Sequence, residues 1–148
     1  MLSRAEATDL VLDAKQTKGM SFDELAGHIG RHEVWVASAI LGQATMSPEE
    51  AQTVADVLGL DPEVAEALTR IPSRGAFNGD VPVDPLLYRF FEIIQVFGPA
   101  IKEIIHEKFG DGIMSAIDFE MDIERKPDPK GDRVKLTMDG KFLSYRKW

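Results

Sequence analysis

The most constraining feature of the sequence is a stretch of twelve residues, 86–97, that is apolar around its whole helical circumference. Eight of the twelve are Leu, Phe, Ile or Val. Asp84 and Pro85 precede them as an N-cap and a first-turn proline. A helix that is apolar on every side has to be buried on every side. Because a chain of 148 residues is too short to wrap such a helix unaided, we expect contacts between subunits to cover it.

Caps and glycines divide the first 72 residues into short helices. Five helices are predicted. The first spans about 4–17, the second runs from the Ser21 and Glu24 capping box to Gly30, and the third spans about 33–41. The fourth runs from Ser47 and Pro48 to Gly59, and the fifth begins at Asp61 and Pro62. This spacing, with a tight turn at Gly30, is typical of a helix-turn-helix bundle of the phage-repressor type. DNA binding is the function ordinarily associated with such a bundle.

The charge of this bundle argues against DNA. Residues 1–72 carry 5 Lys and Arg against 12 Asp and Glu, a net charge of -7. The helix in the recognition position, 33–41, has one acid and no Lys or Arg, whereas DNA binding needs a basic surface that displaces counterions. We therefore predict a structural or assembly role and no nucleic-acid partner. A helix-turn-helix DNA-binding regulator is kept as the alternative function.

The second half of the chain changes from helical to strand periodicity. Gly98 and Pro99 are expected to interrupt the apolar helix, with a second helical stretch reaching Phe109. Apolar residues then alternate with acids over 117–124 and with basic residues over 133–138, which predicts two half-buried strands joined by a hairpin. In that pairing, opposite charges lie side by side. Asp139 and Gly140 are predicted to form a further tight turn.

These patterns predict an α+β protein with two parts. Three Pro and two Gly between residues 71 and 85 mark a connector. The domain boundaries are therefore placed at 1–72 for the helical bundle, 73–84 for the linker and 85–148 for the helix and β-hairpin. A small sheet with one apolar face has to cover that face, which again favours association.

Arg89 and Glu92 are the only charged residues in the apolar stretch, and they lie three positions apart on one helical face. A guanidinium in a low-dielectric interface is a fork for a carboxylate-like anion, and a neighbouring carboxylate can orient it or manage protons. The alternative is a buried ion pair that fixes the register of an oligomer interface. The spacing alone leaves both interpretations open.

Ser115 is a third candidate, placed just after Gly110, Asp111 and Gly112 where the chain enters a strand. A hydroxyl at this point can donate a hydrogen bond to an anion. The alternative is an ordinary serine at the start of a strand. No His or Asp is placed to make Ser115 a nucleophile.

The sequence shows no cofactor or metal motif. The absence of Cys excludes a disulfide framework, a thiolate metal site and a cysteine nucleophile. His28 and His32 straddle Gly30 and form no cluster with His106, and neither a phosphate loop nor a dinucleotide fingerprint is present. These residues therefore predict no metal or dinucleotide site.

No segment has the pattern of a membrane span or a leader. The longest charge-free run, residues 34–48, has fifteen residues and includes Ser and Thr, too short and polar to cross a bilayer. The first ten residues contain Arg4, Glu6 and Asp9 and lack the apolar centre of a signal peptide. We expect a cytoplasmic protein with no membrane partner.

Two long segments carry a family resemblance. Residues 85–98 read Pro-Leu-Leu-Tyr-Arg-Phe-Phe-Glu-Ile-Ile-Gln-Val-Phe-Gly, and residues 106–119 read His-Glu-Lys-Phe-Gly-Asp-Gly-Ile-Met-Ser-Ala-Ile-Asp-Phe. Both closely resemble the cyanase family, the cyanate hydratases or lyases. Shorter segments at 41–43, 71–75 and 139–143 extend the resemblance over nearly the whole chain.

The resemblance implies a fold, an assembly and a reaction. It implies a repressor-like bundle that does not bind DNA, a catalytic and dimerisation domain with intertwined strands, and a homodecamer made of five dimers. It implies conversion of cyanate and bicarbonate to ammonia and carbon dioxide through a carbamate, without a metal or organic cofactor. The family's catalytic Arg, Glu and Ser fall on Arg89, Glu92 and Ser115. A non-catalytic oligomeric module is a further alternative.

The sequence departs from the family pattern at two positions. Some members have a Cys where this chain has Ala76, and a Pro is expected where it has Ser144. Neither departure falls on the three residues of the predicted site.

Overall fold

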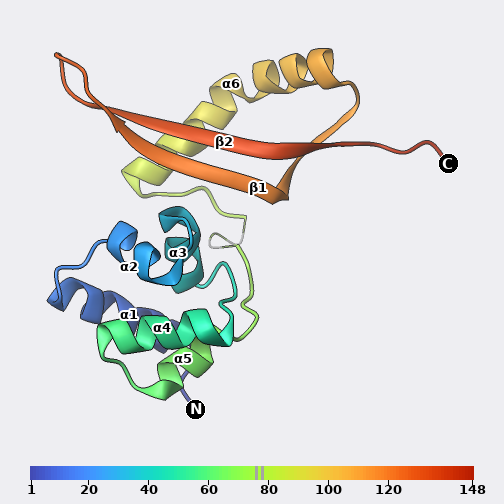
Figure 1. Ribbon diagram of the computed structural model, residues 1–148. Coiled ribbons are helices and arrows are strands. Elements are labelled where there is room, and N and C mark those ends of the chain that lie inside the picture. The colour runs from blue at the N-terminus through green and yellow to red at the C-terminus, as the bar shows by residue number, and fades with distance from the viewer. Residues whose placement is uncertain (76, 78) are drawn as a thin grey trace. The chain divides into compact units, whose positions relative to one another are not determined.

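The computed structural model describes residues 1–75, 77 and 79–148, which form six helices and one two-stranded sheet (Figure 1). Two compact units divide the chain, Met1–Ala76 and Phe77–Trp148, called here the helical unit and the hairpin unit. The mixture of helix and sheet confirms the α+β prediction at that level. Ala76, one of the two family departures, lies outside the described residues, as does Asn78 in the predicted linker.

The helical unit contains α1 to α5, and their ends follow the local capping signals. Their bounds are α1 Arg4–Thr17, α2 Phe22–Ile29, α3 Glu33–Ile40, α4 Pro48–Leu58 and α5 Pro62–Leu68. The predicted capping boxes at Ser21 and Ser47 are both present. Gly30 and Gly59 close α2 and α4 with φ of 75° and 71°, a left-handed conformation that favours glycine.

A single apolar core lies among these five helices. Of the residues that the structure describes, sixteen have buried hydrophobic side chains, and all sixteen belong to the helical unit. They include Val11 from α1, Leu25 from α2, Ile40 from α3, Val54 from α4 and Leu68 from α5, so every helix contributes its apolar face. The helical unit therefore buries its own hydrophobic surface within one chain.

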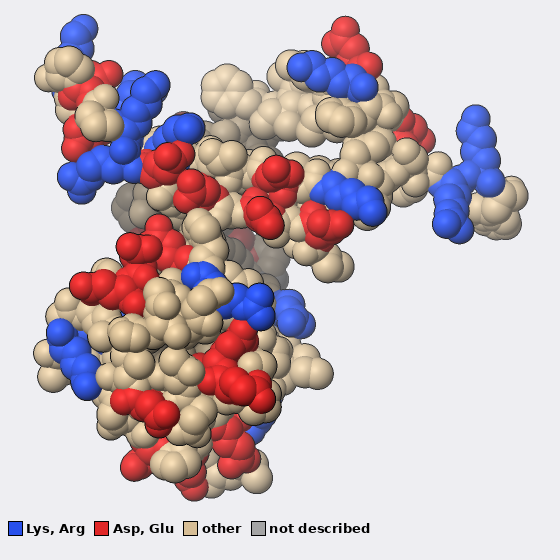
Figure 2. Space-filling view, viewed as in Figure 1, with Lys and Arg blue, Asp and Glu red and all other residues tan. Residues whose placement is uncertain are grey.

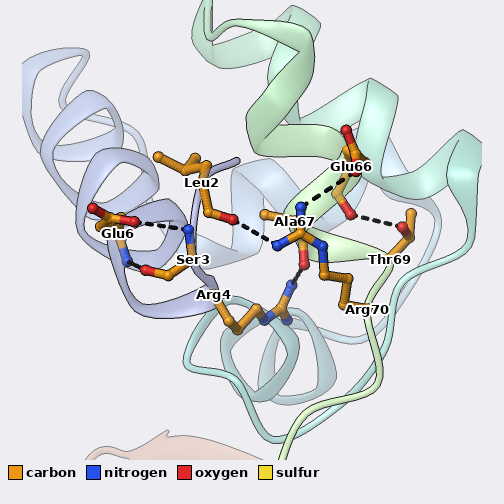
Figure 3. A network of polar contacts seen from close by, with 8 residues as sticks. All are labelled: Leu2, Ser3, Arg4, Glu6, Glu66, Ala67, Thr69 and Arg70. Atoms are coloured by element: carbon orange, nitrogen blue, oxygen red, sulfur yellow. Dashed lines mark hydrogen bonds and ion pairs between the residues drawn. The ribbon is translucent and has the colours of Figure 1, made fainter.

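A polar network, which the sequence did not reveal, ties the start of the chain to this core. The guanidinium of Arg4 donates to the carbonyls of Ala39, Ala44 and Ala67. Arg70 donates to the carbonyl of Leu2 at 2.6 Å. Figure 3 shows the two arginines approaching the end of α5 from neighbouring segments. Ala39 and Ala67 lie in the last turns of α3 and α5, where carbonyls have fewer helical partners, and the guanidinium of Arg4 adds a donor to each.

The hairpin unit begins with α6, Pro85–Phe109, a helix of 25 residues. Asp84 caps it as predicted, its carboxylate accepting from the backbone N–H groups of Leu86 and Leu87 at 2.9 and 3.0 Å. The predicted interruption at Gly98 and Pro99 is wrong, because Pro99 lies inside the helix. A proline removes one backbone hydrogen bond and crowds one carbonyl, which bends a helix without ending it. The ribbon of α6 changes direction partway along its length (Figure 1).

The strands β1, Gly112–Lys126, and β2, Arg133–Ser144, pair antiparallel. The predicted charge pairing is confirmed where Glu124 faces Lys135, with 3.0 Å between carboxylate and ammonium. Ser144 ends β2 opposite Gly112, a strand-end position that a proline also tolerates.

The predicted turn at Asp139 and Gly140 is wrong. β2 runs straight through these residues, and Gly140 pairs with Phe119. The irregularity lies on the other strand: Met114 pairs with Phe142 and Phe119 with Gly140, so β1 bulges between residues 114 and 119. A glycine inside a strand often marks such a bulge or a close backbone approach, and here it does both.

Candidate active site

Arg89 and Glu92 lie on the first turns of α6, where the Asp84 cap fixes the start of the helix. A nitrogen of the Arg89 guanidinium, Nη1, lies 3.2 Å from the Oε2 of Glu92. The Cζ of Arg89 lies 5.7 Å from the centre of the Tyr88 ring. One side of the guanidinium is thus held by a carboxylate and its plane lies near an aromatic ring, which limits its orientations.

A shallow hollow of about 290 Å³ adjoins this ion pair. Ile93, Val96 and Phe97 line the rest of it, so the charged pair stands at the edge of an apolar surface. The side chains of Arg89 and Glu92 are 63% and 49% exposed in the single chain. The guanidinium therefore retains donors that a small anion can reach, and a second surface laid over the hollow would strengthen their attraction by excluding water.

Ser115 is held in the bulge of β1 and is the one polar side chain buried in the described part of the chain, at 5% exposure. Its Oγ accepts hydrogen bonds from the backbone N–H groups of Ile117 at 3.1 Å and Asp118 at 3.0 Å. This is more than an ordinary serine at a strand start, because the hydroxyl closes the turn of the bulge.

The structure brings together two of the three predicted residues. Arg89 and Glu92 are in contact, as their spacing predicts. Over the described residues, the hydrogen bonds of Ser115 go to its own bulge and to neither Arg89 nor Glu92. Within one chain the candidate site is therefore in two pieces, an ion pair on α6 and a hydroxyl on β1.

Other features of the described residues bear on alternative functions. Residues 1–75, 77 and 79–148 include no group of three His, Cys, Asp or Glu side chains suited to a metal ion. In the same residues, no helix is both long and apolar enough to cross a membrane. On the face of the helical unit seen in Figure 2, acidic side chains are more prominent than basic ones, in line with its net charge.

Comparisons with known proteins cover both units. Residues 4–72 match the family described as "Cyanate hydratase, N-terminal", and residues 79–147 match "Cyanate lyase C-terminal domain". A cyanate hydratase of Synechococcus sp. (strain CC9311) is 54% identical over 146 residues, which is 99% of this chain and 97% of that protein. The chain belongs to the cyanate hydratase family.

Further relatives agree with this assignment. A cyanate hydratase of Synechococcus elongatus is 55% identical over 141 residues, covering 95% of this chain and 97% of that protein. The crystal structure of cyanase from T. urticae matches with a TM-score of 0.84 and 41% identity, covering 93% of this chain and 96% of that one. The resemblance predicted from the sequence is confirmed, and the matched residues 79–147 include Arg89, Glu92 and Ser115. The roles of these three residues remain predictions.

Sequence reasoning missed two features near these motifs. The first is Gly140, which lies on β2 across from the Ser115 bulge. A glycine inside a strand pattern was the signal that could have revealed it.

The second is Gln43, which binds the segment that follows α5. Its side-chain oxygen accepts a hydrogen bond from the N–H of Gly75 at 2.9 Å, and its backbone carbonyl accepts one from the side chain of Arg74 at 3.1 Å. No spacing in the sequence links Gln43 to Arg74.

Proposed function

We propose that this chain is a cyanate hydratase that decomposes cyanate with bicarbonate to ammonia and carbon dioxide through a carbamate. The observation that carries the proposal is the Arg89–Glu92 pair at the edge of an apolar hollow, in a chain 54% identical to a cyanate hydratase over 99% of its length. Cyanate and bicarbonate are both small anions, and a guanidinium offsets the repulsion of bringing them together.

The proposed reaction balances with two protons. The bicarbonate oxygen attacks the cyanate carbon and gives a dianionic adduct, which takes up one proton and splits into carbamate and carbon dioxide. The carbamate takes up a second proton and breaks its C–N bond to give ammonia and a second carbon dioxide. Holding both anions together removes much of the entropic barrier to their encounter.

The three candidate residues divide this work. Arg89 binds the bicarbonate or the dianionic adduct, because its fork of N–H donors matches two oxygens. Ser115 donates a hydrogen bond to the other anion. Glu92 orients Arg89 through the 3.2 Å contact or relays protons.

The proposed assembly is a homodecamer of five dimers with intertwined strands, in which different copies of the chain complete each site. Two observations support a shared site: α6, all of which the structure describes, has no buried residue, and among the described residues of one chain no hydrogen bond joins Ser115 to the ion pair. An active monomer in sedimentation with parallel assay would contradict this part of the proposal.

The deciding experiment measures ammonia release from cyanate by the purified protein, with bicarbonate present and with carbon dioxide and bicarbonate stripped out. We expect release only with bicarbonate, and two carbon dioxide molecules per ammonia. Equal release of ammonia with and without bicarbonate would overturn the role of bicarbonate as co-substrate. No release in either condition would overturn the proposed function.

Two further expectations belong to this proposal. We expect turnover to survive prolonged dialysis against a metal chelator, since no metal or organic cofactor is invoked. A loss of activity that a divalent ion restored would contradict this expectation.

We also propose that the repressor-like bundle does not bind DNA. The support is its net charge of -7 over residues 1–72. A mobility shift at low salt would oppose that view.

A further inference from the structure

The bulge of β1 leaves Ser115 with one free hydrogen-bonding function. A serine oxygen has two lone pairs and one proton. Both lone pairs are engaged by the N–H groups of Ile117 and Asp118, at 3.1 and 3.0 Å. The hydroxyl proton is what remains, so Ser115 is set to donate a hydrogen bond and poorly set to accept one.

Gly140 on β2 makes room for this bulge. A Cβ built on Gly140 would lie 2.6 Å from the carbonyl oxygen of Ser115 and 2.6 Å from the Cγ of Met114. Real Cβ atoms essentially never make such contacts under 3.0 Å. The Met114 side chain can swing away, but the Ser115 carbonyl is backbone and moves only if the bulge moves.

We propose that Gly140 is a positioning residue for Ser115. Its missing side chain lets the backbone of the bulge approach β2, and that approach holds the Ser115 hydroxyl with its proton free for an anion. The proposal rests on the proposed function, because it assigns the free proton to the cyanate or bicarbonate bound during turnover. Asp139 and Gly140 belong to a segment that carries the family resemblance. The proposal explains Gly140 by the space that the bulge needs, whereas the predicted turn did not.

A double-mutant cycle on the full-length protein tests this inference. Gly140→Ala, Ser115→Ala and the double variant are assayed for bicarbonate-dependent ammonia release, with sedimentation and thermal unfolding of each variant. We expect Gly140→Ala to lower kcat by about tenfold to a hundredfold, the range expected when a donor is misplaced by about 1 Å. In the Ser115→Ala background the same change should lower kcat by less than about twofold, because the hydroxyl it positions is gone.

A purely structural role would give a different pattern. Gly140→Ala would then lower kcat by the same factor with and without the Ser115 hydroxyl, and that additive result would overturn the proposal. Wild-type kcat in an assembled Gly140→Ala variant would overturn it as well. If the wild type itself releases no ammonia, the proposed function fails instead, and the inference is judged by the exchange measurement below.

A second variant separates the two close contacts. Met114→Ala with Gly140→Ala removes the Cγ contact and keeps the contact with the Ser115 carbonyl. We expect Gly140→Ala to lower kcat by the same factor in the Met114→Ala background as in the wild type. Recovery would show that the Met114 side chain alone was displaced, against the proposal. Thr137→Ala, on the same strand and away from the bulge, is the control and should keep wild-type kcat.

Amide hydrogen exchange keeps the inference testable if Gly140→Ala does not assemble. The N–H groups of Ile117 and Asp118 should exchange slowly in the wild type and at least about tenfold faster in Ser115→Ala, because they lose the oxygen that they bond. Fast exchange of both amides in the wild type would overturn the proposal.

Discussion

The two units of the chain solve the problem of hydrophobic burial in opposite ways. The helical unit, over its described residues 1–75, buries sixteen hydrophobic side chains among five short helices, whereas α6 in the hairpin unit buries none. Ten large apolar residues of α6 are exposed in the single chain: Leu86, Leu87, Phe90, Ile93, Ile94, Val96, Phe97, Ile101, Ile104 and Phe109. An exposed apolar surface of that extent is typical of an interface, which supports the proposed assembly. The comparison teaches that the unit with a complete core is the scaffold, and the unit without one carries the candidate chemistry.

The largest effect is expected where the apolar surface of α6 is broken. Ile94 is 58% exposed in the single chain, and Ile94→Asp would place a charge in the surface that other copies cover in the proposed assembly. We expect the oligomer to dissociate and turnover to fall below detection, measured by sedimentation and ammonia release. Leu10→Asp on α1, at a site 42% exposed, is the matched control. If Leu10→Asp dissociated the protein and Ile94→Asp did not, the comparison between the units would be reversed.

A second change should abolish chemistry and leave assembly intact. Arg89→Leu removes the proposed anion fork and keeps an apolar side chain beside the hollow. Losing one such charge stabiliser costs on the order of a hundredfold to a thousandfold in kcat, and here the residue also binds the substrate, so we expect at least a thousandfold loss. Sedimentation should match the wild type. Lys102→Leu, further along α6, is the control that keeps activity, and full activity of Arg89→Leu would remove it from the site.

The sequence predicted much of the helical unit because its signals are local. A capping serine at Ser21 or Ser47 sets a helix start whatever lies beyond it, and Gly30 sets an end. Signals that depend on a distant partner failed. Pro99 bends α6 without ending it, and Gly140 lies in a strand because the β1 bulge needs the space. Neither outcome can be read from the residues on either side.

The candidate site divides along the same line. The contact between Arg89 and Glu92 follows from a spacing of three on a helix and was predicted correctly. Nothing in the spacing linked Ser115 to them, and only the family resemblance placed it in the site. Its two backbone hydrogen bonds are local, from residues two and three positions along the chain. The bulge in which they form comes from the pairing of β1 with the distant strand β2, which a local pattern does not encode.

A change of intermediate size is expected in the scaffold. Arg4→Leu would remove the donor that the carbonyls of Ala39, Ala44 and Ala67 share. Ala39 and Ala67 would keep a backbone N–H donor each, from Gly42 and Arg70, so the main loss falls on Ala44, and an unpaired acceptor costs about 1–3 kcal/mol. We expect a loss of about 1–3 kcal/mol in the unfolding free energy of the helical unit, followed by Trp35 fluorescence in a Trp148→Phe background. A loss under about 1 kcal/mol would show that the hydrogen bonds of Arg4, seen in part in Figure 3, contribute little to the stability of the helical unit.

The smallest effect is a pH dependence confined to the scaffold. Burial raises the pKa of Glu50, but the backbone N–H of Ser47 and the guanidinium of Arg31, at 2.6 Å, outweigh it and lower the pKa below the ordinary 4.5. A carboxyl whose pKa is lower in the folded state stabilises that state above the unfolded-state pKa. The stabilisation is lost as the pH falls from about 4.5 through the lowered value.

Glu50→Gln isolates this contribution, since glutamine still completes a capping box without carrying charge. We expect the variant to be less stable than the wild type near pH 7, by under about 1 kcal/mol because the Arg31 partner is exposed. The two stabilities should converge as the pH drops below about 4.5. The measurement is Trp35 fluorescence during urea unfolding from pH 7 to pH 3, and Glu63→Gln, on α5 and outside any capping box, is the control. A gap that stayed constant with pH would assign the effect to side-chain packing, and the charge of Glu50 would then have no part in holding α4.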